Sequence, residues 1–170
     1  MDAKTFRSKL ERSESLGFIP GGVQEILMMD PMQPNDILMY LKNRKGFIKI
    51  ALQYGSPVVP VFIFNLDGSY NWWFPRGNKF IAKISRIVGF VPLLFTGRFG
   101  IPFFIPKPRK LHLVCGRPID IPLMSSVSSN EEDIQLCIDK YHAIFCTEMI
   151  ALYDRHKVAA GYEFRKLVLV

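Results

Sequence analysis

The sequence has few cysteines and no paired spacing among them. Cys115, Cys137 and Cys146 are odd in number and form no C-x-x-C pair. Such a set argues against a disulfide framework and against a structural zinc site, both of which need more cysteines or closer spacing. We therefore expect free thiols in a reducing compartment that faces the cytosol.

The sequence also lacks a hydrophobic run long enough to cross a membrane. Its longest apolar stretches are residues 57–64 and 87–95, whereas a spanning helix needs roughly 20 residues. The first residues are polar and charged, unlike a secretory signal peptide. Any membrane association is therefore expected to be peripheral, or to depend on a segment outside this chain.

Several common catalytic and metal-binding signatures are missing. The chain has no G-x-S-x-G, no P-loop and no H-E-x-x-H. His112, His142 and His156 are isolated, and their surroundings do not suit a metal ligand or a general base. We expect structural or surface roles for these histidines, and neither a metal nor a bound cofactor.

Acidic residues are absent between residues 68 and 118, in a chain whose formal charge is +7. The charge predicts an anionic partner, and basic and aromatic side chains alternate through this stretch. They suit either single-stranded nucleic acid or a lipid interface, while core packing explains about half of the aromatics equally well. The aliphatic runs between them favour lipid over nucleic acid, so we predict a membrane-facing insert at about 68–110. The residues concerned are Arg76, Lys79, Lys83, Arg86, Arg98, Lys107, Arg109, Lys110 and Arg117, with Tyr70, Trp72, Trp73, Phe74, Phe80, Phe90, Phe95, Phe99, Phe103 and Phe104.

The hydrophobic pattern predicts an α/β fold. Apolar residues recur with helical spacing from Phe47 to Tyr54, in a helix expected to be capped by Asn43 and ended by Gly55. Apolar runs at 37–41 and 57–64 flank it, and the second is apolar throughout, as in a strand buried on both faces. We predict a βαβ unit in a mainly parallel sheet covered by helices. Further predictions are a helix over 3–10, strands at 16–20 and 111–115, and a long helix at about 130–157 that opens with the capping box Ser129–Glu132 and ends at Gly161. The chain closes on the apolar run 167–170.

Two short motifs are candidate binding sites. Gly21 and Gly22 directly follow the predicted strand at 16–20, so backbone could approach a ligand there, with Glu25 at the sheet edge; an ordinary Gly-Gly turn explains the same spacing. Lys42–Lys45 precedes a helix start, where cations oppose the helix dipole and a bound phosphate would offset that cost. A solvated basic turn is the alternative reading of this second motif.

The order of these motifs resembles the type-2 diacylglycerol acyltransferase family, particularly its plant and algal members. The resemblance covers almost the whole chain in colinear order. The matching stretches are FIPGGVQEIL (18–27), YLKNRKGFIKIA (40–51), GSPVVPVF (55–62), YNWWFPRG (70–77), GRFGIP (97–102), VCGRPI (114–119), LYDRHK (152–157) and AGY (160–162).

The resemblance implies transfer of a fatty acyl group from acyl-CoA to diacylglycerol, giving triacylglycerol. It also implies the α/β fold of glycerophospholipid acyltransferases and a place on the cytosolic face of the endoplasmic reticulum or on lipid droplets. By likeness, Gly21, Gly22 and Glu25 match the family's second glycine-rich motif, with Glu25 in a supporting catalytic role. The substrate-binding residues implied in the same way are Arg44, Lys45, Gly46 and Phe47 of the RKGF stretch, and Gly97, Arg98 and Gly100 of the GRxG loop.

One departure from the family pattern bears on activity. The family's His-Pro-His-Gly motif, which is expected to supply the general base, is absent from this chain. We therefore expect residues 1–170 to be the C-terminal portion of one acyltransferase domain, incomplete on its N-terminal side and catalytically almost silent alone. The open alternatives are a monoacylglycerol, long-chain alcohol or sterol acceptor, and a non-catalytic protein that binds lipid surfaces. Self-association through an exposed apolar edge is also expected.

Overall fold

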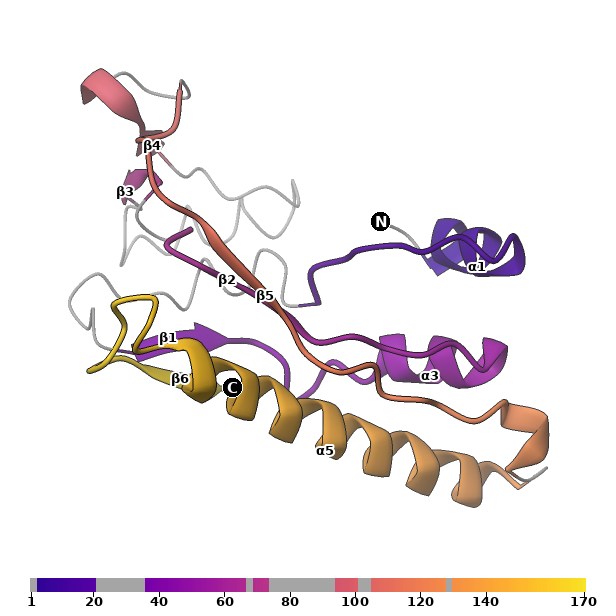
Figure 1. The fold of residues 1–170 in the computed structure, drawn as a ribbon. Coiled ribbons are helices and arrows are strands. Elements are labelled where there is room, and N and C mark those ends of the chain that lie inside the picture. The colour runs from indigo at the N-terminus through magenta and orange to yellow at the C-terminus, as the bar shows by residue number, and fades with distance from the viewer. Residues whose placement is uncertain (1–2, 21–35, 67–68, 74–93, 101–104, 128–129) are drawn as a thin grey trace, which may run out of the picture. The chain divides into compact units, whose positions relative to one another are not determined.

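The structure is a computed structural model of the chain, and it describes residues 3–20, 36–66, 69–73, 94–100, 105–127 and 130–170. Contacts within the chain divide it into two compact units, residues 1–62 with 114–170 and residues 63–113. The elements are α1 (Ala3–Glu11), β1 (Asp36–Met39), α3 (Gly46–Tyr54), β2 (Val61–Phe64), β3 (Asn71–Trp73), β4 (Leu94–Thr96), the 3₁₀ turn η1 (Arg98–Gly100), β5 (His112–Cys115), η2 (Met124–Ser126), α5 (Glu131–His156) and β6 (Lys166–Leu169) (Figure 1).

The first unit contains a parallel strand pair made by residues far apart in the sequence. β1 pairs with β6 in the register Asp36–Lys166 to Met39–Leu169. The amides of Leu41 and Lys42 both donate to the carbonyl of Val170, each at 3.0 Å, which extends the pairing past the end of β1. The strand predicted at 37–41 is therefore confirmed, and its partner β6 contains most of the apolar run at 167–170.

The described strands form separate pairs and not one continuous sheet. β1 pairs with β6, β2 with β5, and β3 with β4. The α/β class and the presence of a parallel pair are confirmed, but the partner of β1 is β6 and not β2, so the predicted βαβ pairing was wrong. Sequence order favoured β2 as the partner, whereas the pairing that forms joins the chain's C-terminal segment to β1.

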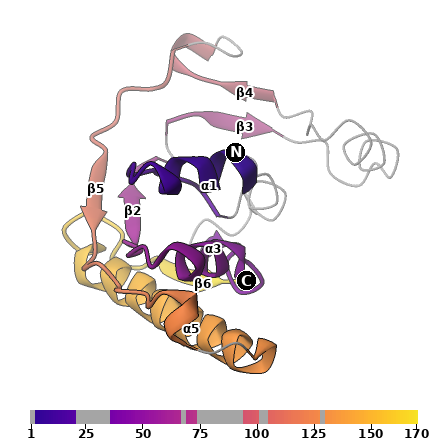
Figure 2. The ribbon, with the colours of Figure 1, turned by 90° about the vertical axis from the view of Figure 1, so that its right-hand side faces the viewer.

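α5 is the longest element of the first unit and covers α3. It buries Ile138, His142, Phe145, Met149, Leu152 and Tyr153, and Figure 2 shows α3 alongside it. The side chain of Asn130 accepts a hydrogen bond from the amide of Glu132 at 3.2 Å, so the cap lies one residue after the predicted Ser129, which is outside the described residues. The predicted helix is confirmed, but it ends at His156, five residues before Gly161.

Two strand predictions were wrong. No strand forms at 16–20; instead, the Phe18 ring lies against Phe6 and Phe47, with ring centroids 5.2 and 5.4 Å away. β2 was expected to be buried on both faces, yet Val61 and Ile63 are 41% and 38% exposed while alternate residues are buried. A continuous apolar run does not reveal which face a strand covers, because burial follows from what packs on each side.

The second unit contains an antiparallel pair. β3 pairs with β4 in the register Asn71–Thr96 to Trp73–Leu94. The amide of Lys107 donates to the carbonyl of Ser69 at 2.8 Å, and its ammonium donates to the Asn71 side chain at 2.6 Å. The predicted membrane-facing insert lies within this unit, although residues 74–93 and 101–104 of it are outside the described part. Within the described residues, no helix is both long and apolar enough to cross a membrane.

Candidate functional site

The candidate residues fall into three groups. Gly21, Gly22 and Glu25 lie outside the described residues. Arg44, Lys45, Gly46 and Phe47 lie at the start of α3, in the first unit, whereas Gly97, Arg98 and Gly100 lie in and just before η1, in the second.

The segment Leu41–Lys45, called the basic turn below, links β1 to α3. Its first carbonyl, that of Leu41, accepts a hydrogen bond from the amide of Arg44 at 2.9 Å. The same carbonyl lies 3.0 Å from Nε2 of the buried His142 on α5. Because a carbonyl oxygen can only accept, His142 Nε2 carries the proton and donates. The turn is thus fixed both locally and from α5.

Lys45 closes the basic turn and precedes the first residue of α3. It is the N-cap of that helix and supplies no side-chain cap bond, so the predicted cap at Asn43 was wrong. Its ammonium instead donates to Asp139 Oδ1 on α5 at 2.8 Å. Asp139 Oδ1 also accepts from the side-chain Nε2 of Gln135 at 2.9 Å. The hydrogen bond from Lys45 is the main reason that the pKa of Asp139 is lowered below its usual value.

Phe47 and Gly46 are adjacent in sequence but differ in their surroundings. Phe47 is buried, and its ring centroid lies 5.1 Å from that of Phe145 and 6.3 Å from that of His142. It therefore anchors α3 in the core of the first unit. A Cβ at Gly46 would meet no atom within 4 Å, so the space around this residue is open. That openness leaves room for a ligand at the helix start.

The charge around the start of α3 is mainly positive. The first turn of α3 carries no acidic residue. The Arg44 guanidinium carbon lies 5.1 Å from the centroid of the Tyr40 ring, a cation–π distance. Lys42 is exposed. The backbone amides of the first helical turn and the positive end of the helix dipole add to this positive potential. This end of α3 can therefore attract an anionic group such as phosphate.

The second candidate group is a loop held by its own backbone. The amide of Arg98 donates to the carbonyl of Ile105 at 2.8 Å. Phe99 and Gly100 have φ angles of 68° and 72°, in the left-handed region. The Arg98 guanidinium carbon lies 5.0 Å from the Phe99 ring centroid, and this ring is 77% exposed. A basic group and an aromatic ring are therefore presented together at the surface of the second unit.

The glycine of the VCGRPI stretch has a structural explanation. A Cβ at Gly116 would come within 2.6 Å of Cγ of Pro60, and the amide of Gly116 donates to the carbonyl of Pro60 at 2.8 Å. The backbone of Gly116 packs so closely against the Pro60 ring that no side chain fits between them. The packing beside the β2–β5 pair therefore requires a glycine at position 116.

The cysteines are all free, as predicted. Burial raises the pKa of the Cys146 thiol, which therefore stays protonated at neutral pH. Its sulfur lies 3.8 Å from Nε2 and 3.9 Å from Nδ1 of His142. Among the described residues no cluster of three His, Cys, Asp or Glu could hold a metal ion.

Asp139 and His142 were missed as site residues by sequence reasoning. They lie 94 and 101 positions after their partners, Lys45 and Leu41. Their spacing of three residues on a predicted helix was visible, and it places both on one helical face. Nothing in the sequence indicated that this face meets the basic turn.

Comparison with known proteins gives one consistent result. Residues 2–170 match the family described as diacylglycerol acyltransferase. Diacylglycerol O-acyltransferase 2 of Dictyostelium discoideum is 38% identical over 151 residues, which cover 85% of this chain and 43% of the relative. Human acyl-CoA wax alcohol acyltransferase 1 is 33% identical over 153 residues, covering 86% and 44%. Mouse diacylglycerol O-acyltransferase 2 is 29% identical over 171 residues, covering 91% and 39%.

The chain therefore spans less than half the length of these curated relatives. No solved structure matches it.

Proposed function

The chain belongs to the diacylglycerol acyltransferase family, and we propose that it forms part of an acyl-CoA-dependent O-acyltransferase. The reaction proposed is transfer of a fatty acyl group from acyl-CoA to the free hydroxyl of diacylglycerol, giving triacylglycerol and coenzyme A. The observation that carries this proposal is the family match over residues 2–170. The fold proposed for the complete domain is that of glycerolipid acyltransferases.

The basic turn is the proposed contact for the phosphates of acyl-CoA. Lys42 and Arg44 bring positive charge to the start of α3, where free amides and the helix dipole also favour an anion. The open space at Gly46 leaves room for such a group. Acyl-CoA is a co-substrate in this proposal, and no cofactor or metal is invoked.

The relatives identify the acyl acceptor less specifically than the acyl donor. The chain is similar both to diacylglycerol O-acyltransferase 2 of D. discoideum and to a human wax alcohol acyltransferase, at 38% and 33% identity. A long-chain alcohol is therefore the second candidate acceptor, beside monoacylglycerol and sterol. We propose diacylglycerol first because two of the three relatives compared above and the family description refer to it.

The proposed location is the cytosolic face of the endoplasmic reticulum membrane, or a lipid droplet. The exposed Phe99 with Arg98 beside it suits an interface where an aromatic ring meets lipid and a cation meets anionic headgroups. If the chain binds lipid without catalysis, its binding to anionic liposomes should weaken as salt is raised.

An acyl-transfer assay tests the proposal. The purified chain and the polypeptide immunoprecipitated from source cells with an antibody against residues 130–157 would be given labelled oleoyl-CoA with diacylglycerol, monoacylglycerol, a long-chain alcohol or a sterol. We expect transfer to diacylglycerol by a cellular product larger than 19.5 kDa and almost none by the purified chain, which has no His-Pro-His-Gly motif. Robust acyl transfer by the purified chain would refute the expectation that it is almost inactive alone.

The assay also separates the competing functions. Faster transfer to the alcohol than to diacylglycerol would replace the acceptor. A cellular product of 19.5 kDa that binds liposomes without transferring acyl groups would favour the non-catalytic reading.

A further inference from the structure

Both ends of the basic turn contact the same face of α5. At the beginning, the Leu41 carbonyl accepts from His142 Nε2 at 3.0 Å. At the end, the Lys45 ammonium donates to Asp139 Oδ1 at 2.8 Å. Asp139 and His142 are three residues apart in α5 and so lie on one side of it. A single helical face therefore holds the segment between β1 and α3 at two points.

The contact at Leu41 also determines the local shape of the turn. Leu41 is completely buried, and its carbonyl receives the turn's own hydrogen bond from the amide of Arg44 at 2.9 Å. His142, which is only 6% exposed, supplies a second bond to the same oxygen. The backbone conformation that presents Arg44 is thereby coupled to the position of α5.

The contact at Lys45 changes the role expected of this residue. Its ammonium is already bonded to a carboxylate, so a phosphate group would have to compete with Asp139 for it. About two-fifths of each side chain is exposed, 41% for Lys45 and 43% for Asp139. The pair is thus accessible to solvent and contributes modestly to stability, which makes substitution feasible without unfolding the chain.

We propose that Asp139 and His142 are positioning residues for the basic turn, and that Lys45 supports the site through its ion pair with Asp139 and not by contacting phosphate. This inference rests on the proposed function in one respect, namely that the basic turn binds the phosphates of acyl-CoA. The clamp itself, which is the pair of contacts from α5, is independent of that function.

Charge reversal tests the inference. The variants are Lys45→Glu, Asp139→Lys and the double variant K45E/D139K of the full 170-residue chain. The first readout is hydrogen exchange at the amides of Arg44 and Lys49, which bond to Leu41 and Lys45 carbonyls. The second readout is the affinity for coenzyme A, measured by isothermal titration calorimetry.

For a positioning role, each single variant should speed exchange at the turn by about two- to five-fold, the range expected for an exposed ion pair, and weaken coenzyme A binding. The double variant should restore both readouts, because the ion pair is rebuilt with its charges exchanged. Restored exchange without restored binding would overturn the inference, since Lys45 would then contact the phosphates directly. Unchanged exchange in both single variants would also overturn it.

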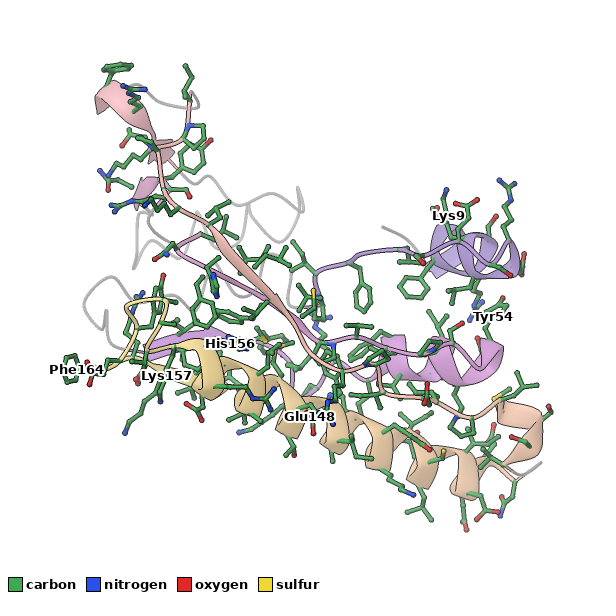
Figure 3. The ribbon with its side chains drawn as sticks, in the orientation of Figure 1. Lys9, Tyr54, Glu148, His156, Lys157 and Phe164 are labelled. Carbon is green, nitrogen blue, oxygen red and sulfur yellow. The ribbon has the colours of Figure 1, made fainter. Side chains whose placement is uncertain are left out.

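The two readouts separate this inference from the proposed function. If the wild-type chain does not bind coenzyme A, phosphate binding by the turn fails, and the exchange data alone judge the clamp. The matched control is K157E/D154K with its single variants, because Lys157 and Asp154 form a comparable 2.6 Å ion pair at the C-terminal end of α5 (Figure 3). These changes should leave exchange at Arg44 and Lys49 unaltered.

Discussion

The basic turn and the Gly97–Gly100 loop show two ways of holding the same kind of sequence motif. Both place an arginine within two residues of a glycine, Arg44 near Gly46 and Arg98 between Gly97 and Gly100. The basic turn is held by side chains of α5, through His142 and Asp139. The loop is held mainly by its own backbone, through the bond from the amide of Arg98 to the Ile105 carbonyl and two residues with positive φ.

The difference shows where each motif's geometry comes from. In the loop, the left-handed backbone at Gly100 is a local requirement that a glycine meets at no steric cost. Gly46, which directly follows the basic turn, has open space and no positive φ, so the conformation of the turn depends on distant contacts and not on this glycine. Substitutions at distant positions should therefore disturb the turn and leave the loop unchanged.

The largest expected effect follows removal of the His142 side chain. His142→Ala loses a buried hydrogen bond and the packing of the ring against Phe47, so we expect the free energy of unfolding to fall by about 2–3 kcal/mol. Urea denaturation would measure it. The control is Glu148→Ala, an exposed position on the same helix (Figure 3), which should stay within about 0.5 kcal/mol. Equal losses in the two variants would contradict a specific role for His142.

A glycine pair gives an intermediate effect and compares the two regions directly. Gly100→Ala puts a side chain on a backbone with φ of 72°, which should cost about 1 kcal/mol of stability in the loop. Gly46→Ala meets no atom and has no positive φ, so it should be neutral or stabilise by up to about 1 kcal/mol. Thermal unfolding of both variants would measure the difference. A larger loss at Gly46 would mean that the turn, too, requires glycine locally.

The smallest expected effect concerns the titration of Asp139. Its pKa is lowered chiefly by the hydrogen bond from Lys45, so Lys45→Met should raise the pKa back toward the usual value. Carboxyl-carbon NMR during an acid titration would measure the shift. Because the folded-state pKa is lowered, the pair's contribution to stability is present above the ordinary pKa of an aspartate and is lost as pH falls through the lowered one.

Wild-type and Lys45→Met chains should therefore differ in stability at neutral pH and converge in strong acid. Lys157→Met is the matched control and should leave the Asp139 titration unchanged, because Lys157 pairs with Asp154. A constant difference in stability at all pH values would show that packing of the lysine stem, and not the ion pair, is responsible.

Much of the local structure could be predicted because it follows from nearby residues. The helical spacing from Phe47 to Tyr54 and the stop at Gly55, whose φ is 59°, are both found. The long helix α5 and the strands at 37–41 and 111–115 were also predicted within a few residues. The cap positions were less accurate, since Lys45 and Asn130 replace the expected Asn43 and Ser129 as N-caps.

The sequence by itself determined the helices, the free thiols, the excess of positive charge and the family of this protein, because each depends on residue type or on spacing along the chain. Only the tertiary structure decided that β1 pairs with β6 and that Asp139 and His142 hold the basic turn. Those contacts join residues between 94 and 130 positions apart. Their partners are selected by how buried faces pack in three dimensions, and spacing along a single chain carries no record of that choice.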